Sequence, residues 1–155
     1  MARRRLSELD STTARQSQAP SIGAVLKRAE QAMMRSKSAA LKPIGLTLAQ
    51  YVALVELDRQ PGITGAALAR ATQVTPQAMM VVLKSLEDQG LIARTPHPRH
   101  PIVLEVRVSD AGREALSAAR KRVAPIERRI LSAFSAAELD ALRELLARWI
   151  DAAGD

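Results

Sequence analysis

The stretch from Thr75 to Lys84 spaces polar, apolar and basic side chains so that several share one side of an expected helix. The amide of Gln77 can pair with N6 and N7 of adenine, and the ammonium of Lys84 can neutralise a phosphate. Met80 and Val81 offer apolar contact to thymine methyl groups. Thr75 and the first N–H groups of such a helix can also hold a phosphate. These residue types indicate a surface that can contact double-stranded DNA.

Each of these residues also has a second interpretation. Gln77 could be an ordinary solvated residue of a first helical turn, although we favour base contact if the chain binds DNA at all. Met80 and Val81 could pack on a neighbouring protein, because exposed apolar side chains are common. Lys84 could be solvated. A protein-interaction surface with weak or lost DNA binding therefore stays open as the alternative.

A basic, proline-rich segment follows and ends in the loop Thr95–Pro101. Its candidate DNA-contacting residues are Arg94, His97, Arg99 and His100. The two imidazoles could make the loop sensitive to pH near about 6.5. Without a nearby Cys or carboxylate they form a poor metal site, so we expect no metal and no cofactor.

Two short helices must position these residues. Thr64 is the expected N-cap of the first helix, which buries Leu68 and Ala67, and Val74 is the expected apolar plug of the turn that follows. The second helix has Thr75 as its cap and stops at Gly90. Its inward face should hold Met79, Val82, Leu83 and Leu86, which leaves Gln77, Ala78, Val81, Lys84 and Asp88 outward.

Two β-rich runs, Leu91–Arg94 and Ile102–Val108, flank the proline-rich loop and predict a hairpin. Helix, turn, helix and hairpin in this order is the layout of a winged helix-turn-helix. Further helices are expected over 21–41, from Thr47 with Gln50 as a capping box, over 110–131 and after Ser135. Pro125 should kink or interrupt the helix over 110–131. The fold class is therefore mainly α with a small β-hairpin wing.

Composition narrows the possible classes of protein. The 155 residues carry a net charge of +7, with nine Lys and Arg against three Asp and Glu in residues 1–42, and nine against four in residues 91–129. Such basic regions favour polyanions. We expect no membrane span, no secretion signal and, with no cysteine, a reducing cytoplasm. Phosphate-loop, Cys-nucleophile and HExxH patterns do not occur, so we expect no enzyme.

The chain resembles the MarR family of bacterial transcriptional regulators from residue 21 onward. The strongest match is PGITGAALARATQVTPQAMMVVLKSLEDQGLIAR, and Val108–Arg113 resembles the "L-T-x-x-G" segment that follows the wing in that family. The resemblance implies a repressor, or less often an activator, that binds pseudo-palindromic DNA as a homodimer. It also implies one domain over 20–155. Residues 1–19 are polar and basic and lack periodicity, which predicts a flexible arm. The winged motif would span about 47–108, and dimerisation helices about 21–42 and 110–152.

The resemblance also implies two further surfaces. Apolar positions at both ends of the chain would form the dimer interface: Ile22, Val25, Leu26, Leu139, Leu142, Leu146 and Trp149. A small aromatic acid or phenol would bind between the dimer layer and the winged motif and release DNA. Met33, Met34 and Tyr51 are the candidates for lining that pocket, although core packing is the interpretation we favour for such residues.

The sequence departs from the family pattern in two places. Relatives commonly have D-x-R at the wing, whereas His97–Pro101 contains no acid, which leaves Arg99 as the groove-entering cation without its usual support. Val81 stands where many relatives carry Arg. Both departures remove charge-assisted contacts, so we expect weaker DNA binding or a stronger dependence on A·T-rich groove shape.

Overall fold

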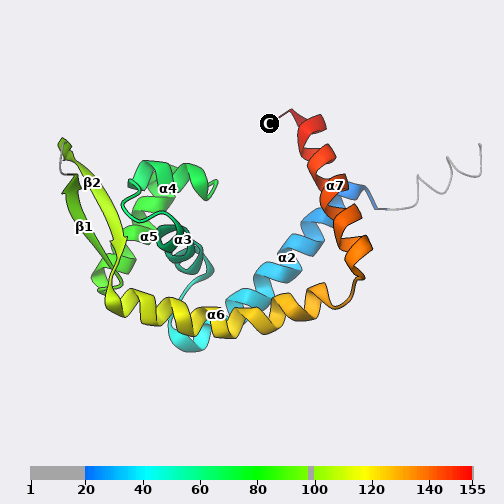
Figure 1. The fold of residues 1–155 in the computed structure, drawn as a ribbon, viewed down its shortest axis with the longest axis horizontal. Coiled ribbons are helices and arrows are strands. Elements are labelled where there is room, and N and C mark those ends of the chain that lie inside the picture. Colours follow the sequence, from blue (N-terminus) through cyan, green and yellow to red (C-terminus); the bar gives the residue numbers. More distant parts are fainter. Residues whose placement is uncertain (1–19, 98–99, 155) are drawn as a thin grey trace, which may run out of the picture. The chain divides into compact units, whose positions relative to one another are not determined.

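The computed structural model describes residues 20–97 and 100–154. The helices are α2 (Ile22–Leu41), the short 3-10 turn η1 (Lys42–Ile44), α3 (Leu48–Arg59), α4 (Gly65–Ala71), α5 (Pro76–Asp88), α6 (Asp110–Leu131) and α7 (Ala136–Ala153). Strands β1 (Ile92–His97) and β2 (His100–Val108) lie between α5 and α6 and form one antiparallel hairpin (Figure 1). The expected fold class, mainly α with a hairpin wing, is confirmed.

Internal contacts divide the chain into two units, one ending at Arg35 and the other beginning at Ser36, so α2 belongs to both. The second unit contains the helix-turn-helix, the hairpin, α6 and α7. The expected basic arm over 1–19 lies outside the described residues. Among the described residues no single helix is long and apolar enough to span a membrane, and only the bent pair α2–η1 and α3 reaches that length and composition together.

Short polar side chains begin the helices where the sequence predicts them. Thr47, Thr64, Thr75, Ser109 and Ser135 each accept a hydrogen bond from a backbone N–H three residues on. Each cap satisfies a backbone donor that the first turn leaves without a partner. Thr47 and Ser135 form the two predicted capping boxes. At Ser135 the backbone and hydroxyl donors also lower the pKa of Glu138 below its usual value.

The core of the second unit is made of aliphatic side chains from the C-terminal end of α2, from α3, α4, α5 and α6, and from both strands. Its fully buried large members are Leu41, Leu54, Leu57, Leu68, Leu83, Leu86, Val106, Leu116 and Val123. Met79 is buried as predicted, and Val82 packs against the core while partly exposed. α6 continues through Pro125 as one helix, so the interruption considered for that residue does not occur.

Two predictions about the turn before α5 are wrong. Val74 is 42% exposed and is not a buried plug; the residue before it, Gln73, adopts a left-handed backbone (φ 55°). Ala69, not Ala67, is the buried alanine of α4. Helical spacing explains why Ala69 is buried in place of Ala67. The face of α4 toward the core is shared by Gly65, Leu68, Ala69 and Thr72, and Ala67 lies beside that face.

The hairpin is longer than its sequence predicts. Register pairs run from Ile92–Val108 to Pro96–Leu104, and after an irregularity His97 pairs with His100. The strands thus enter the proline-rich segment that we expected to be a loop. A two-stranded hairpin has two edges, so a proline without an N–H is tolerated there. On its other side β2 exchanges hydrogen bonds with the segment before α4, from Gly62 N to Val106 O and from Val106 N to Ile63 O, both 3.1 Å.

A close packing contact joins α6 to the base of the wing. The Ser109 hydroxyl donates to the Gly90 carbonyl at 2.7 Å and accepts from Gly112 N at 3.0 Å, while Ser109 N donates to the Leu91 carbonyl at 3.0 Å. A Cβ on Gly112 would lie 2.0 Å from the Leu91 carbonyl oxygen. Only glycine allows the first turn of α6 to sit this close to the chain leaving α5.

Replacing Gly112→Ala should therefore lower the free energy of unfolding by about 3 kcal/mol, the upper part of the range for overpacking, because the clash is with backbone. Urea unfolding followed by circular dichroism measures this. Gly23→Ala is the matched control, since nothing lies within 4 Å of a Cβ there and alanine is the better helix former. A cost at Gly112 no larger than that at Gly23 would show that the contact does not constrain α6.

Candidate nucleic-acid interface

α5 presents one apolar face to the core and the opposite face to solvent. Met79, Leu83 and Leu86 are at most 3% exposed, whereas Met80 is 64% and Val81 72% exposed. The remaining outward residues named by the sequence are also exposed, namely Thr75, Gln77, Ala78 and Lys84. These six residues thus come together on one helix, as the 3.6-residue period requires. Their contact with DNA is a prediction that this placement supports.

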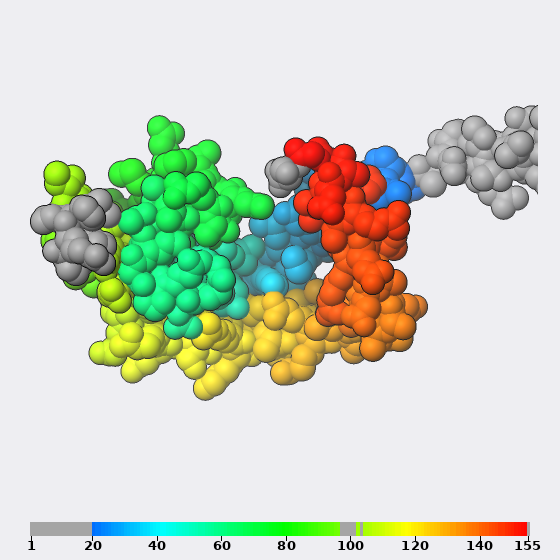
Figure 2. All heavy atoms as spheres, turned by 45° about the horizontal axis from the view of Figure 1, so that its top comes forward, coloured from blue at the N-terminus to red at the C-terminus, as the bar shows by residue number. Residues whose placement is uncertain are grey.

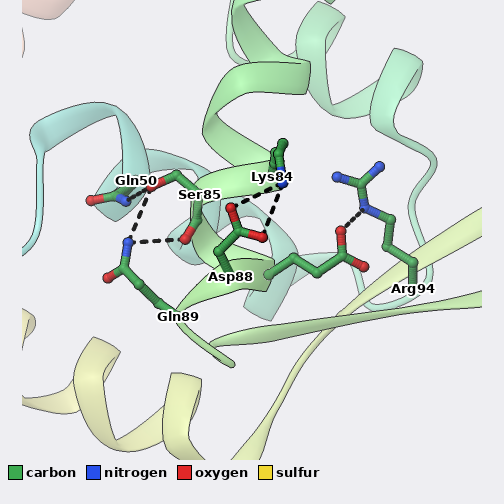
Figure 3. A network of polar contacts seen from close by, with 7 residues as sticks. Gln50, Lys84, Ser85, Asp88, Gln89 and Arg94 are labelled. Carbon is green, nitrogen blue, oxygen red and sulfur yellow. Dashed lines mark hydrogen bonds and ion pairs between the residues drawn. The ribbon is translucent and has the colours of Figure 1, made fainter.

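A buried amide fixes how α5 is rotated about its own axis. Gln50 on α3 is 5% exposed, and its Nε2 donates to the Ser85 hydroxyl at 3.0 Å, while its Oε1 accepts from Thr47 N at 2.8 Å. Gln89 also donates to Ser85, to the backbone oxygen at 2.9 Å and to the hydroxyl at 3.2 Å (Figure 3). The capping box of α3 is therefore linked directly to the middle of α5.

Sequence reasoning identified Gln50 as a capping residue and missed this second role. The signal was present: Gln50 stands three and four residues before the buried Ala53 and Leu54, so its side chain belongs to the inward stripe of α3. A buried polar group needs a hydrogen-bond partner, and that requirement predicts a polar residue on the facing helix. Only the fold identifies that residue as Ser85.

The two cations of this surface are each paired with a carboxylate of α5. Lys84 Nζ lies 3.1 Å from both oxygens of Asp88, one helical turn later. Arg94 on β1 places its Nε 3.1 Å from Glu87 Oε2 (Figure 3). That Nε is buried and has no hydrogen-bond partner among the described residues, so its contact with Glu87 is an ion pair only. Because exposed pairs contribute only about 0.3–0.5 kcal/mol, a phosphate can compete for Lys84.

A shallow hollow lies where α5 meets β1. It has a volume of about 580 Å³ and is lined by Met80, Val81, Lys84, Ser85, Glu87, Asp88 and Arg94. In the space-filling view the hairpin lies directly beside the green residues of α4 and α5 (Figure 2). Apolar side chains and paired charges thus share one open surface next to the wing.

The tip of the wing is only partly described. His97 and His100 are register partners at the end of the strands, while Arg99 lies outside the described residues, as do the side chains of both histidines. Within the described parts of the chain, no group of three or more His, Cys, Asp or Glu residues could hold a metal ion. The roles predicted for His97, Arg99 and His100 therefore remain predictions.

The candidate effector residues fall in different units. Met33 and Met34 lie on the part of α2 that belongs to the first unit and are 38% and 43% exposed. Tyr51 belongs to the second unit and packs half-buried against the core. A separate hollow of about 490 Å³ at the start of α3 is lined by Ser38, Lys42, Gly45, Leu46, Thr47 and Leu48.

α7 buries none of its residues in the single chain. Its large apolar side chains Leu142, Leu145, Trp149 and Ile150 are 40–58% exposed, and Leu139 and Leu146 are half-buried. On α2, Ile22 and Val25 are also exposed, and Leu26 is half-buried. An exposed apolar helix of this kind needs a partner.

Comparison with known proteins agrees with the winged helix-turn-helix layout of the chain. The family model described as "MarR family" matches residues 44–100. The chain is 35% identical over 125 residues to the HTH-type transcriptional repressor Rv2887 of Mycobacterium tuberculosis, covering 81% of this chain and 90% of that protein.

Two solved structures show the same fold. Rv2887 in complex with salicylic acid is 33% identical, with a TM-score of 0.67 over 86% of this chain and 98% of that one. The repressor CouR of Rhodococcus jostii, bound to a 23-mer DNA duplex, is 30% identical, with a TM-score of 0.77 over 84% and 92%. Together with the capped helix α5 and the hairpin wing, these relatives show that the chain belongs to the MarR family of transcriptional regulators.

Proposed function

We propose that this protein is a transcriptional repressor that binds a pseudo-palindromic operator as a homodimer. The observation that carries the proposal is the outward face of α5, where Gln77, Val81 and Lys84 are exposed while the opposite face is buried in the core. Two such helices read successive major grooves about 34 Å apart. The repressor activity of Rv2887 and the DNA complex of CouR support the same function.

The remaining parts of the chain have roles within this function. The domain extends over 20–155, with the winged motif at 47–108 and dimerisation helices at 21–42 and 110–152. Arg99 enters the minor groove from the wing, and Arg94, His97 and His100 lie beside it. The basic arm over 1–19 adds charge. As a DNA-binding regulator the protein acts in the cytoplasm and has no enzymatic activity.

DNA affinity should fall steeply with salt, because bound phosphates release counterions. The probe is a duplex enriched by the protein from a randomised library, titrated by fluorescence anisotropy at several salt concentrations. Lys84→Ala should reduce the slope of log affinity against log salt by about two, one unit for each subunit. Asp88→Asn should strengthen binding, since it releases Lys84 from its carboxylate.

Lys121→Ala on α6 is the control for loss of a positive charge elsewhere on the chain, and we expect it to change the slope less than Lys84→Ala. Absence of DNA binding even at low salt would contradict the proposal. It would favour the alternative, a winged-helix module that binds protein through its exposed Met80 and Val81.

Dimerisation through α2 and α7 should be measurable in the same protein. Sedimentation equilibrium should give twice the chain mass of 16.8 kDa. Leu145→Asp, at a side chain that is 58% exposed in the single chain, should shift the protein toward monomer without unfolding it. Val81→Asp is the matched control on α5 and should stay dimeric. A wild-type protein that sediments as a monomer at micromolar concentration would overturn the dimer.

A small aromatic acid is the effector class that we propose, supported by the salicylic acid complex of Rv2887. Met33, Met34 and Tyr51 remain the candidate pocket residues. The hollow at the start of α3 adds chemistry that suits this class, because Lys42 offers an ammonium beside the apolar Leu46 and Leu48.

Salicylic acid at millimolar concentration should therefore weaken operator binding, whereas salicylamide, which lacks the carboxylate, should do so much less. Lys42→Gln should bind the operator normally and lose the difference between the two compounds. Equal operator affinity with and without salicylic acid would remove this effector class, and the operator titrations would be unaffected by that result.

A further inference from the structure

We infer that α5 recognises thymine bases by their C5-methyl groups, through the side chains of Val81 and Met80. This inference rests on the proposed operator binding and specifies what the operator contains. In the complex, the exposed apolar patch of Met80 and Val81 then faces the floor of a major groove that carries thymine methyl groups.

The outward face of α5 combines one paired basic residue with exposed apolar side chains. Lys84 is the single basic residue between Pro76 and Asp88, and both oxygens of Asp88 lie 3.1 Å from its ammonium. An arginine fork is the commonest side-chain reader of guanine, and α5 contains no arginine. At the middle of the face, Val81 and Met80 are 72% and 64% exposed. The contact that remains for these side chains on a base edge is apolar.

The second feature of this face is the spacing of Gln77 and Val81. They are four residues apart and both exposed, so they lie one above the other on the same side of the helix. Gln77 has the amide that pairs with adenine N6 and N7. A helix face that combines an amide with an apolar side chain one turn later can contact an adenine and an adjacent thymine.

Charges are paired at the C-terminal end of the outward face of α5. Glu87 and Asp88 hold Arg94 and Lys84 at 3.1 Å, and all four residues line the hollow of about 580 Å³ together with Val81 and Met80. Because both cations of the hollow are paired with these carboxylates, they are poorly available to the N7 and O6 acceptors of guanine. The hollow is open and partly apolar, so a methyl group can enter it.

Deoxyuridine provides a direct test, because it differs from thymidine by this methyl group alone. The probe is the duplex that wild-type protein enriches from a randomised library, with each thymine replaced singly by deoxyuridine. Burial of one methyl-sized group corresponds to about a fourfold change in affinity. At one or more thymines in each half-site, wild-type binding should weaken by about fourfold.

The variants separate this contact from other effects of deoxyuridine on the duplex. Val81→Ala should bind the thymine duplex less tightly and lose the sensitivity at that thymine. It removes an exposed side chain and places a good helix former in α5, so the protein should remain folded. Val52→Ala on α3 makes the same change at a residue that is 41% exposed, and should keep the full thymine preference.

The outcomes also distinguish the two levels of the proposal. If no duplex is enriched, the proposed operator binding fails, and the inference fails with it. If a duplex is enriched and bound equally well with thymine and deoxyuridine, operator binding stands and methyl recognition is overturned. Methyl sensitivity that persists unchanged in both Val81→Ala and Met80→Ala would likewise overturn the assignment to these residues.

Discussion

Burial of Met79, Leu83 and Leu86 determines which side of α5 remains available to DNA. Removing each side chain from water contributes about 1.5–3 kcal/mol, more than the roughly 1 kcal/mol of a single hydrogen bond. Apolar burial is not directional, however, and it permits small rotations of the helix. The bond from Gln50 to Ser85 selects one rotation, because a buried amide loses its partner if α5 turns. Gly112 and Ser109 then fix α6 against the chain that leaves the helix.

This arrangement separates affinity from specificity. Residues 43–90, which contain the helix-turn-helix, carry three basic and four acidic side chains, whereas the segments before and after them are strongly basic. Phosphate attraction must then come mainly from the flanking segments and from the wing. In the proposed operator complex, α5 contributes an amide and apolar side chains, which would distinguish bases by hydrogen bonding and by methyl contact. Val81 carries no charge where many relatives have Arg, which is consistent with this division of roles.

Local signals predicted most of the fold. The caps at Thr47, Thr64, Thr75, Ser109 and Ser135 depend on residues within one turn, and the period of the apolar side chains depends on one helix, so both can be read from sequence. Predictions failed where contacts between distant segments decide. The pairs Gln50–Ser85 and Glu87–Arg94 join elements that sequence spacing does not relate. The exposure of Val74 is a local exception: it follows the left-handed Gln73, a backbone conformation that the residue types did not indicate. The candidate DNA residues from Gln77 to Lys84 share one helix and were therefore predictable as a group.

In the proposed operator complex, the solvent face of α5 lies in the major groove. Photo-crosslinking tests it most directly, with benzoylphenylalanine placed at position 77 on α5 or, as the control, at position 52 on α3. On the enriched duplex, the position 77 protein should crosslink to bases at two symmetric places about one helical turn apart, and the position 52 protein should not. Crosslinks from position 52 alone, or from neither position while the duplex is bound, would contradict the account.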